Sequence, residues 1–376
     1  MNFFNKIKNG FEWIAQKSKL ADIQNTDNEQ LKLSVLRILA GIILLIRNTE
    51  IVYAAPYMGY LDGMNNEGLI YLFVIILFIL GFFTPLISIF LLLTYVLQFS
   101  SHYGTHTLGD TTFIQLLTIM IFLNHGSKLS IDAWILSKKN ILSKILSKAY
   151  SIIGFPKKKD FKTIYFYGLS AYALVSFGAF LYHVTDPHWI KGYTVHALLV
   201  NTYLCKYSDF FREIENISPL IMKWNSYIGL IGQSIFQLFM IFLLFFRWGK
   251  IFVQYWGWIF FILSLIFIQL SYLPHMEIAL WIAIFYRFEF KKIAKYSYKL
   301  PENLNFRYNI YPSIFFYVVI STLYVLTNYR AINEVTYKVL GSYLTGKISW
   351  GCYAAGYALP IVFNQDDWLW EITGFF

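Results

Sequence analysis

Long apolar runs alternate with short polar segments along most of the chain. The runs cover residues 33–55, 68–83, 85–101, 111–124, 163–182, 227–246, 251–271, 274–288 and 310–327. A helix that crosses about 30 Å of hydrocarbon needs about 20 apolar residues. The pattern therefore predicts an all-α, polytopic membrane helix bundle of eight or nine transmembrane helices, the short run at 274–288 accounting for the range.

The stretch Gly81–Asp132 contains the clearest turn and loop signals between apolar runs. Residues 68–101 are too long for a single crossing, and Pro85 lacks the N–H that a continuous helix needs. A turn at Gly81–Pro85 is predicted, so the two flanking runs form a helical hairpin.

Two segments outside the spans have amphipathic spacing. Phe3, Phe4, Ile7, Phe11 and Ile14 recur at helical spacing, which predicts that residues 1–30 form a cytoplasmic interfacial helix rather than a cleaved signal peptide. The inner loop 137–161 combines the apolar residues Ile141, Leu142, Ile145 and Leu146 with interleaved lysines. We expect it to form a second interfacial helix, held by anionic lipid headgroups.

Composition excludes an ordinary soluble domain. Of the 376 residues, 57% are hydrophobic and only 14% are charged, and the mean hydropathy is +0.51. A net charge of +10 is compatible with nucleic-acid binding, but the basic residues lie in a few loops between spans, so no nucleic acid is expected. Most Lys and Arg residues lie in alternate loops, and positively charged loops tend to stay in the cytoplasm. This distribution predicts a cytoplasmic N-terminus, in a multi-pass protein of the inner (cytoplasmic) membrane.

This orientation gathers titratable side chains at the outer face. On that side lie six of the seven histidines and both cysteines. No Gly-rich phosphate loop, zinc-type Cys/His array, nucleophile elbow or dinucleotide fingerprint is found, so the sequence contains no metal-binding motif and no motif for ATP-driven activity. The gathering predicts a polar pocket open to the exterior.

The first candidate group is His102, His106 and Asp110, spaced by four residues. Helical spacing would put them on one face, but Gly104 and Gly109 favour a loop. Three interpretations remain open: hydrogen-bonded loop residues, a catalytic or quinone-contacting cluster, and a metal site.

The second candidate group follows the fifth span. His183, Asp186, His188 and Trp189 lie together here. A carboxylate three residues from an imidazole can orient it as a general base, with His183 as proton acceptor and Asp186 as its orienter. The alternative is that interfacial His and Trp side chains anchor the helix end.

Charged groups near the spans form a third set. His275 and Glu277 follow a Pro between two apolar runs, and a carboxylate there needs a partner or water. Arg37 lies in the first span and either snorkels or holds a neighbour, with the acid Asp132 as one partner.

Cys205 and Cys352 are both predicted outside, where disulfides form. Either they bridge the C-terminal tail to the long outer segment, or they are two thiols that never meet.

The motif residues resemble those of a known family, the horizontally transferred transmembrane (HTTM) domain, which is related to vitamin K-dependent gamma-carboxylase. The resemblance covers roughly residues 31–290. Its motif positions are Arg37 and Gly41; Gly81, Phe83 and Thr84; Gly109 and Asp110; Ser130, Ile131 and Asp132; and Trp189, Gly192 and Thr194.

Two departures shape what the resemblance implies. The carboxylases have a lysine base just before the tryptophan, where this chain has Tyr182, His183 and Val184. Their large extracytoplasmic domain is also missing. The plan looks closer to the membrane component of sporulation-delaying-protein-type antimicrobial peptide systems, which implies maturation of an exported peptide with a small partner protein.

The resulting domain plan has three parts. Residues 1–30 form the interfacial helix, residues 31–290 form the HTTM-like membrane domain, and residues 291–376 add a span near 310–327 and an extracytoplasmic tail. Trp189, Gly192, Tyr182, His275 and Glu277 are expected to shape a pocket for substrate or a quinone. The alternative functions are a quinol-dependent carboxylase- or epoxidase-like enzyme, and a transporter or non-catalytic scaffold.

Overall fold

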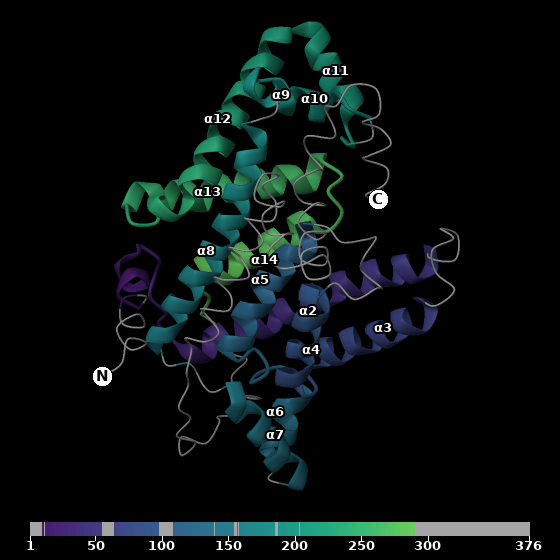
Figure 1. Ribbon diagram of the computed structural model, residues 1–376, viewed down its shortest axis with the longest axis vertical. Helices are drawn as coiled ribbons and strands as arrows, with labels where there is room; N and C mark the ends of the chain where they lie inside the picture. The colour runs from purple at the N-terminus through teal and green to yellow at the C-terminus, as the bar shows by residue number, and fades with distance from the viewer. Residues whose placement is uncertain are drawn as a thin grey trace, which may run out of the picture. The chain divides into compact units, whose positions relative to one another are not determined.

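The computed structural model describes residues 10, 12–54, 64–97, 108–138, 140–153, 156, 158–184, 187–202 and 204–289. Within these residues the secondary structure is helical, apart from one isolated bridge between Cys205 and Ile268. The helices are α2 (Thr26–Ala54), α3 (Met64–Leu80), α4 (Thr84–Leu97), α5 (Leu108–Leu123), α6 (Ile131–Ser137), α7 (Ile141–Ile153), α8 (Lys158–His183), α9 (Pro187–Ile190), α10 (Thr194–Val200), α11 (Ser208–Ile217), α12 (Pro219–Leu243), α13 (Arg247–Phe267) and α14 (Leu273–Phe285) (Figure 1). The predicted all-α class is confirmed.

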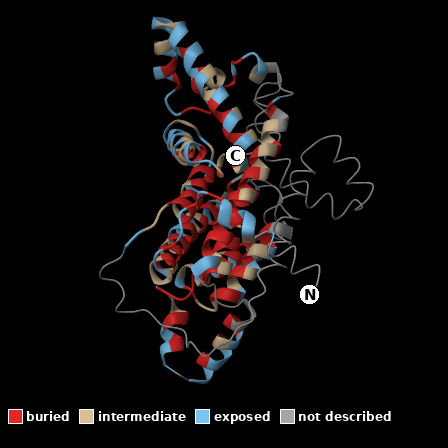
Figure 2. Ribbon diagram, turned by 90° about the vertical axis from the view of Figure 1, so that its left-hand side faces the viewer, coloured by how far each residue is buried: buried red, intermediate tan, exposed pale blue. Residues whose placement is uncertain are grey.

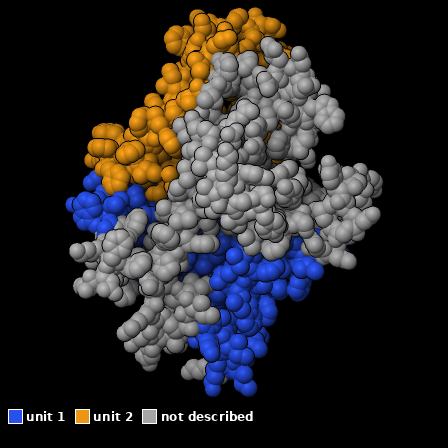
Figure 3. All heavy atoms as spheres, in the orientation of Figure 1, with its two compact units in different colours: residues 1–103, 112–169, 279–318 blue, residues 104–111, 170–278, 319–376 orange. Residues whose placement is uncertain are grey.

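The chain divides into two compact units (Figure 3). Unit 1 comprises residues 1–103, 112–169 and 279–318, and unit 2 comprises residues 104–111, 170–278 and 319–376. Three of the boundaries between the units fall within α5, α8 and α14. Each unit is therefore built from segments that are distant in sequence.

Three of the described helices are long and apolar enough to cross a membrane: Lys158–Phe180, Pro219–Leu243 and Arg247–Phe267. Shorter apolar helices occupy Gly68–Leu80, Thr84–Tyr95, Gly109–Leu123 and Leu273–Phe285. Exposed and buried residues occur along the same helices (Figure 2), and α12 exposes Ile228, Ile231 and Phe239. Such apolar side chains suit contact with lipid tails. The predicted span 310–327 lies outside the described residues.

The predicted hairpin is confirmed. Helix α3 ends at Leu80 and α4 begins at Thr84, with Gly81 at φ 66° and Phe83 at φ 45° between them. Pro85 occupies the first turn of α4, where its missing N–H is harmless. A Cβ on Gly81 would lie 2.5 Å from the Cβ of Ser130, so glycine is required both by the backbone conformation and by the close neighbour.

The segment predicted as the second interfacial helix is helix α7. Leu146 and Tyr150 are buried on one face, while Ile141 and Ile145 are exposed. The buried pair packs with Ile135 and Leu136 of α6. Of the four apolar residues that the sequence assigned to the membrane surface, Ile141, Leu142 and Ile145 are exposed, whereas Leu146 is buried against α6.

The short helices α9, α10 and α11 were not predicted from the sequence. They lie in the segment 183–226, which the span pattern left as one long outer connection. Leu199, Cys205, Phe211 and Met222 form a small core there. Each helix is too short to stand out against a pattern of much longer apolar runs.

Candidate functional site

A buried arginine lies near the centre of unit 1. Arg37 on α2 is fully buried, and its guanidinium donates hydrogen bonds to the carbonyl oxygens of His125, at 2.9 Å, and Leu129, at 2.5 Å. Hydrogen bonds from a buried cation to carbonyl oxygens offset part of its desolvation cost. Arg37 thereby fixes the loop between α5 and α6 against α2.

The carboxylate of Asp132 holds the hairpin turn. One oxygen accepts the N–H of Phe83 and the other accepts the N–H of Thr84, both at 2.7 Å, at the start of α4. Tyr150 on α7 donates its O–H to the second oxygen at 2.8 Å. Burial raises the pKa of Asp132, while these hydrogen bonds act in the opposite direction. A single carboxylate thus joins α4, α6 and α7.

Five of the motif residues in the first half of the chain meet at this place, whereas Gly109 and Asp110 belong to unit 2. We call Arg37, Gly81, Thr84, Ser130 and Asp132 the hairpin cluster. Arg37 donates to carbonyl oxygens and Asp132 accepts from N–H and O–H donors, so these two side chains share the cluster without bonding to each other directly. Their roles are those of fold determinants, consistent with the structural role predicted for both.

Two buried acids of unit 2 each bond to a tyrosine. Tyr272 donates its O–H to Asp110 in the first turn of α5. Tyr172 on α8 donates to Oε1 of Glu277 at 2.6 Å, and Oε2 of Glu277 has no partner among the described residues. Asp110, predicted in a loop, therefore begins a helix. A buried carboxylate oxygen without a donor is costly and marks Glu277 as a candidate functional group.

His183 stacks on Trp189 in unit 2. The ring centroids are 3.8 Å apart and the ring planes differ by 2°. His183 is buried, and its Nδ1 has no hydrogen-bond partner among the described residues. Burial lowers the pKa of His183 to about 3, so the imidazole is neutral at pH 7. The helix end thus presents a neutral ring with one uncommitted nitrogen.

The other predicted site residues are distributed as follows. His102, His106, Asp186 and Cys352 lie outside the described residues, and so do the side chains of Tyr182 and His188. Gly192 ends the turn after α9 at φ 81°, with the Tyr227 ring against it. His275 is exposed at the start of α14. Cys205 is a buried free thiol whose pKa is raised by burial.

A charged network in unit 1 was not predicted. The carboxylate of Glu29 bonds to Lys32 Nζ at 2.6 Å and accepts the O–H of Tyr165 at 2.7 Å, and Arg287 Nε lies 3.7 Å from it. Lys32 also donates to the carbonyl oxygens of Ala283 and Tyr286. The only sequence signal was the spacing of three between Glu29 and Lys32. We call Glu29, Lys32, Tyr165 and Arg287 the inner network.

Among the described residues, no group of three or more His, Cys, Asp or Glu side chains is placed to hold a metal ion. Half-buried His196 does pair with Glu215, with 2.9 Å between Nε2 and Oε1. This pair links α10 to α11 and was also missed from the sequence. No local sequence pattern pairs His196 with Glu215. The pairing follows only from the way in which α10 and α11 pack together.

The burial of His183 predicts a pH-dependent stability. A histidine whose pKa is lower in the folded than in the unfolded chain stabilises the fold fully above about pH 6.5 and progressively less as the pH falls toward 3. Between pH 7 and pH 5 this one group should cost about 2 kcal/mol. His183→Phe, which keeps a stacking ring, should flatten the pH profile of unfolding in detergent. Ile190→Val, at an exposed position without a titratable group, serves as the control and should leave that slope unchanged; equal slopes for all three proteins would contradict the expectation.

No family model matches this chain, and no curated protein or solved structure matches it either.

Proposed function

We propose that this chain is a multi-pass protein of the inner (cytoplasmic) membrane that acts in the maturation or production of an exported antimicrobial peptide. In this proposal it has eight or nine spans, a cytoplasmic N-terminus and an outward-facing polar pocket. A small partner protein and the peptide meet it on the outer side.

The observation that carries the proposal is the hairpin cluster. Its members come from three segments of the sequence, and all are motif positions of the resemblance to the HTTM domain family. Residues 37 and 132 are far apart in sequence, yet both contact the turn at Gly81–Thr84. A buried polar cluster needs all of its partners together. That these particular residues are mutual partners supports a shared membrane domain, and through it the role in peptide maturation.

The second candidate function is a quinol-coupled carboxylase- or epoxidase-like enzyme. The stacked rings of His183 and Trp189 favour it, because a flat aromatic pair is a surface on which a quinone ring can pack. In this alternative His183 accepts a proton from the substrate and Asp186 orients the imidazole. A nearby negative charge would be needed to raise the low pKa of His183.

Both functions are tested in the native host by deleting the gene and restoring it with variants. The deletion should abolish the mature exported peptide, measured by mass spectrometry of the culture medium, and the wild-type chain should restore it. Unchanged peptide output in the deletion strain would remove the proposal. If the protein is an enzyme that uses His183, His183→Gln should lower the yield about a hundredfold. If it is a scaffold, removing residues 328–376 should matter more.

The orientation is tested with engineered thiols. In a Cys205→Ser, Cys352→Ser background, Thr105→Cys should react with a membrane-impermeant maleimide in intact cells. Lys144→Cys on α7 is the matched control and should react only after the cells are broken. The reverse pattern would place the polar pocket on the inner side and overturn the topology.

A further inference from the structure

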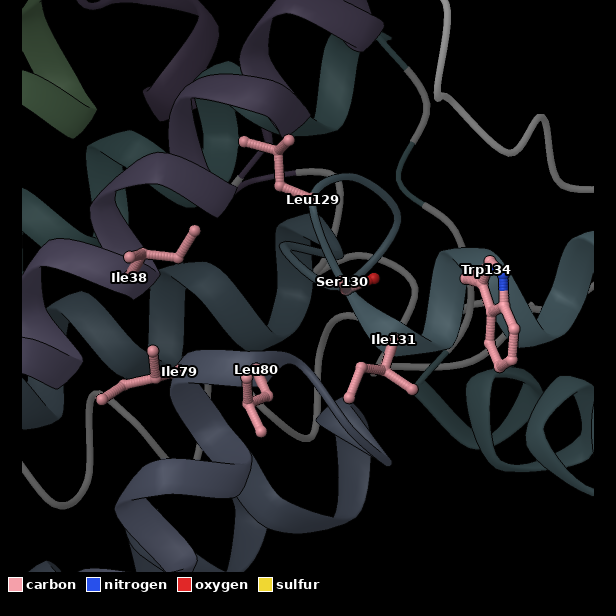
Figure 4. Close-up of a pocket in the computed structure, with 7 residues that line it drawn as sticks. All are labelled: Ile38, Ile79, Leu80, Leu129, Ser130, Ile131 and Trp134. Carbon is pink, nitrogen blue, oxygen red and sulfur yellow. The ribbon is translucent and has the colours of Figure 1, made fainter.

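An open groove in unit 1 lies beside the hairpin cluster, and Ser130 belongs to both. Its volume is about 620 Å³, which is within the range of small-ligand sites. In the view of Figure 4, Trp134 stands at one end and Ile38 and Ile79 at the other. The lining residues are Ile38, Ile79, Leu80, Leu129, Ser130, Ile131 and Trp134. Its lining is apolar except for one serine.

One end of this groove carries a positive charge. The Nζ atom of Lys138 lies 3.7 Å from the centroid of the Trp134 ring, a cation–π contact. The only acidic residue between positions 125 and 157 is Asp132, which is buried and hydrogen-bonded, so no nearby exposed carboxylate offsets the charge of Lys138. The groove is thus apolar along its length and cationic at its end, the combination that complements an anionic amphiphile.

The loops that form the groove contain residues in unfavourable backbone conformations. Three of the four described non-glycine residues with positive φ are Phe83, Asn124 and Leu129, all in the two loops beside the groove. Such conformations cost about 1–3 kcal/mol each and persist where the surroundings enforce them. For Leu129 the constraint is the bond from Arg37 to its carbonyl oxygen. Its side chain is 39% exposed and forms part of the groove wall.

We propose that this groove is a specific site for one anionic phospholipid, with an acyl chain along the apolar wall and the phosphate at Lys138. The proposal does not depend on the function in peptide maturation. It also goes beyond a general attraction of α7 to a charged membrane surface, because it assigns the selectivity to one lysine and one groove.

The test uses the full-length protein in detergent, incubated with phosphatidylglycerol or phosphatidylcholine and examined by native mass spectrometry. The wild-type protein should retain one phosphatidylglycerol in preference to phosphatidylcholine. Lys138→Gln should reduce the phosphatidylglycerol adduct about fivefold, since a lysine near a lipid surface contributes about that factor. Lys144→Gln, the same charge change on exposed α7, should leave the adduct unchanged.

A second pair of variants tests the contact between the acyl chain and the apolar wall of the groove. Leu80→Asn, in the groove at 47% exposure, should reduce the adduct by a similar factor, whereas Leu86→Asn, at 48% exposure on α4 outside the groove, should not. Displacement of the lipid by glycerol phosphate, with Leu80→Asn behaving as wild type, would show a phosphate site only and overturn the proposal. Equal retention of the two lipids, an equal effect of Lys138→Gln and Lys144→Gln, or a quinone in place of the lipid would also overturn it.

Discussion

Asp132→Ala should lower the free energy of unfolding by about 3 kcal/mol or more. The carboxylate is fully buried and accepts three hydrogen bonds, from Phe83 N–H, Thr84 N–H and Tyr150 O–H. Alanine removes the acceptor of the two backbone N–H groups and the bond from Tyr150, and a buried donor left unsatisfied costs about 1–3 kcal/mol. The N-terminus of α4 also loses the negative charge of Asp132 beside it. Equilibrium unfolding in micelles with a rising fraction of sodium dodecyl sulfate measures the change.

Two further variants test whether the lost stability comes from the hydrogen bonds of Asp132. Asp209→Ala removes an acidic residue whose side chain is 90% exposed and should change stability by less than about 0.5 kcal/mol. Tyr150→Phe removes one of the three donors and should cost about 1 kcal/mol. If Asp132→Ala proved as mild as Asp209→Ala, the hairpin cluster would not hold the turn.

Glu29→Ala should be about as damaging, with a loss of about 3–5 kcal/mol. The variant leaves Lys32, which is 2% exposed, without its counter-charge and leaves the O–H of Tyr165 without its acceptor. Breaking a buried ion pair by removing one partner costs more than replacing both partners with apolar residues. The same mixed-micelle titration reports the loss.

The double variant Glu29→Leu, Lys32→Met is the informative control. It removes both charges together, so it should be more stable than Glu29→Ala although it still lacks the bonds of Lys32 to the end of α14. A double variant that is less stable than the single one would show that Lys32 is needed chiefly for those carbonyl oxygens and not as the partner of Glu29.

The sequence predicted the elements whose cause is local. A helix cannot continue past Pro85 without losing a hydrogen bond, and Gly81 favours a turn just before it, so the hairpin could be located within a few residues. The lysines of α7 alternate with apolar residues, and this periodicity alone identified the helix. In both cases the signal lies within one or two turns of the chain, and tertiary contacts did not override it.

The sites depended on contacts that no local pattern encodes. Arg37 and Asp132 were singled out because charge is rare near spans, but Tyr150 as the third member followed only from the packing of α7. The low pKa of His183 arises from burial, which the sequence does not specify, and it makes this residue a weaker base than the bare His-x-x-Asp spacing suggests. The inner network escaped notice because Lys32 and Ala283 are 251 positions apart.

That separation bears on how the protein is made. Lys32 and Arg287 both donate to backbone carbonyls at the end of α14, and both approach Glu29. The ribosome synthesises α2 long before α14. Glu29 and Lys32 on α2 therefore lack their partners near the end of α14 until nearly three hundred residues have been translated. Such distant pairings delay the closing step of folding, and these charges are shielded only once α14 has packed against α2.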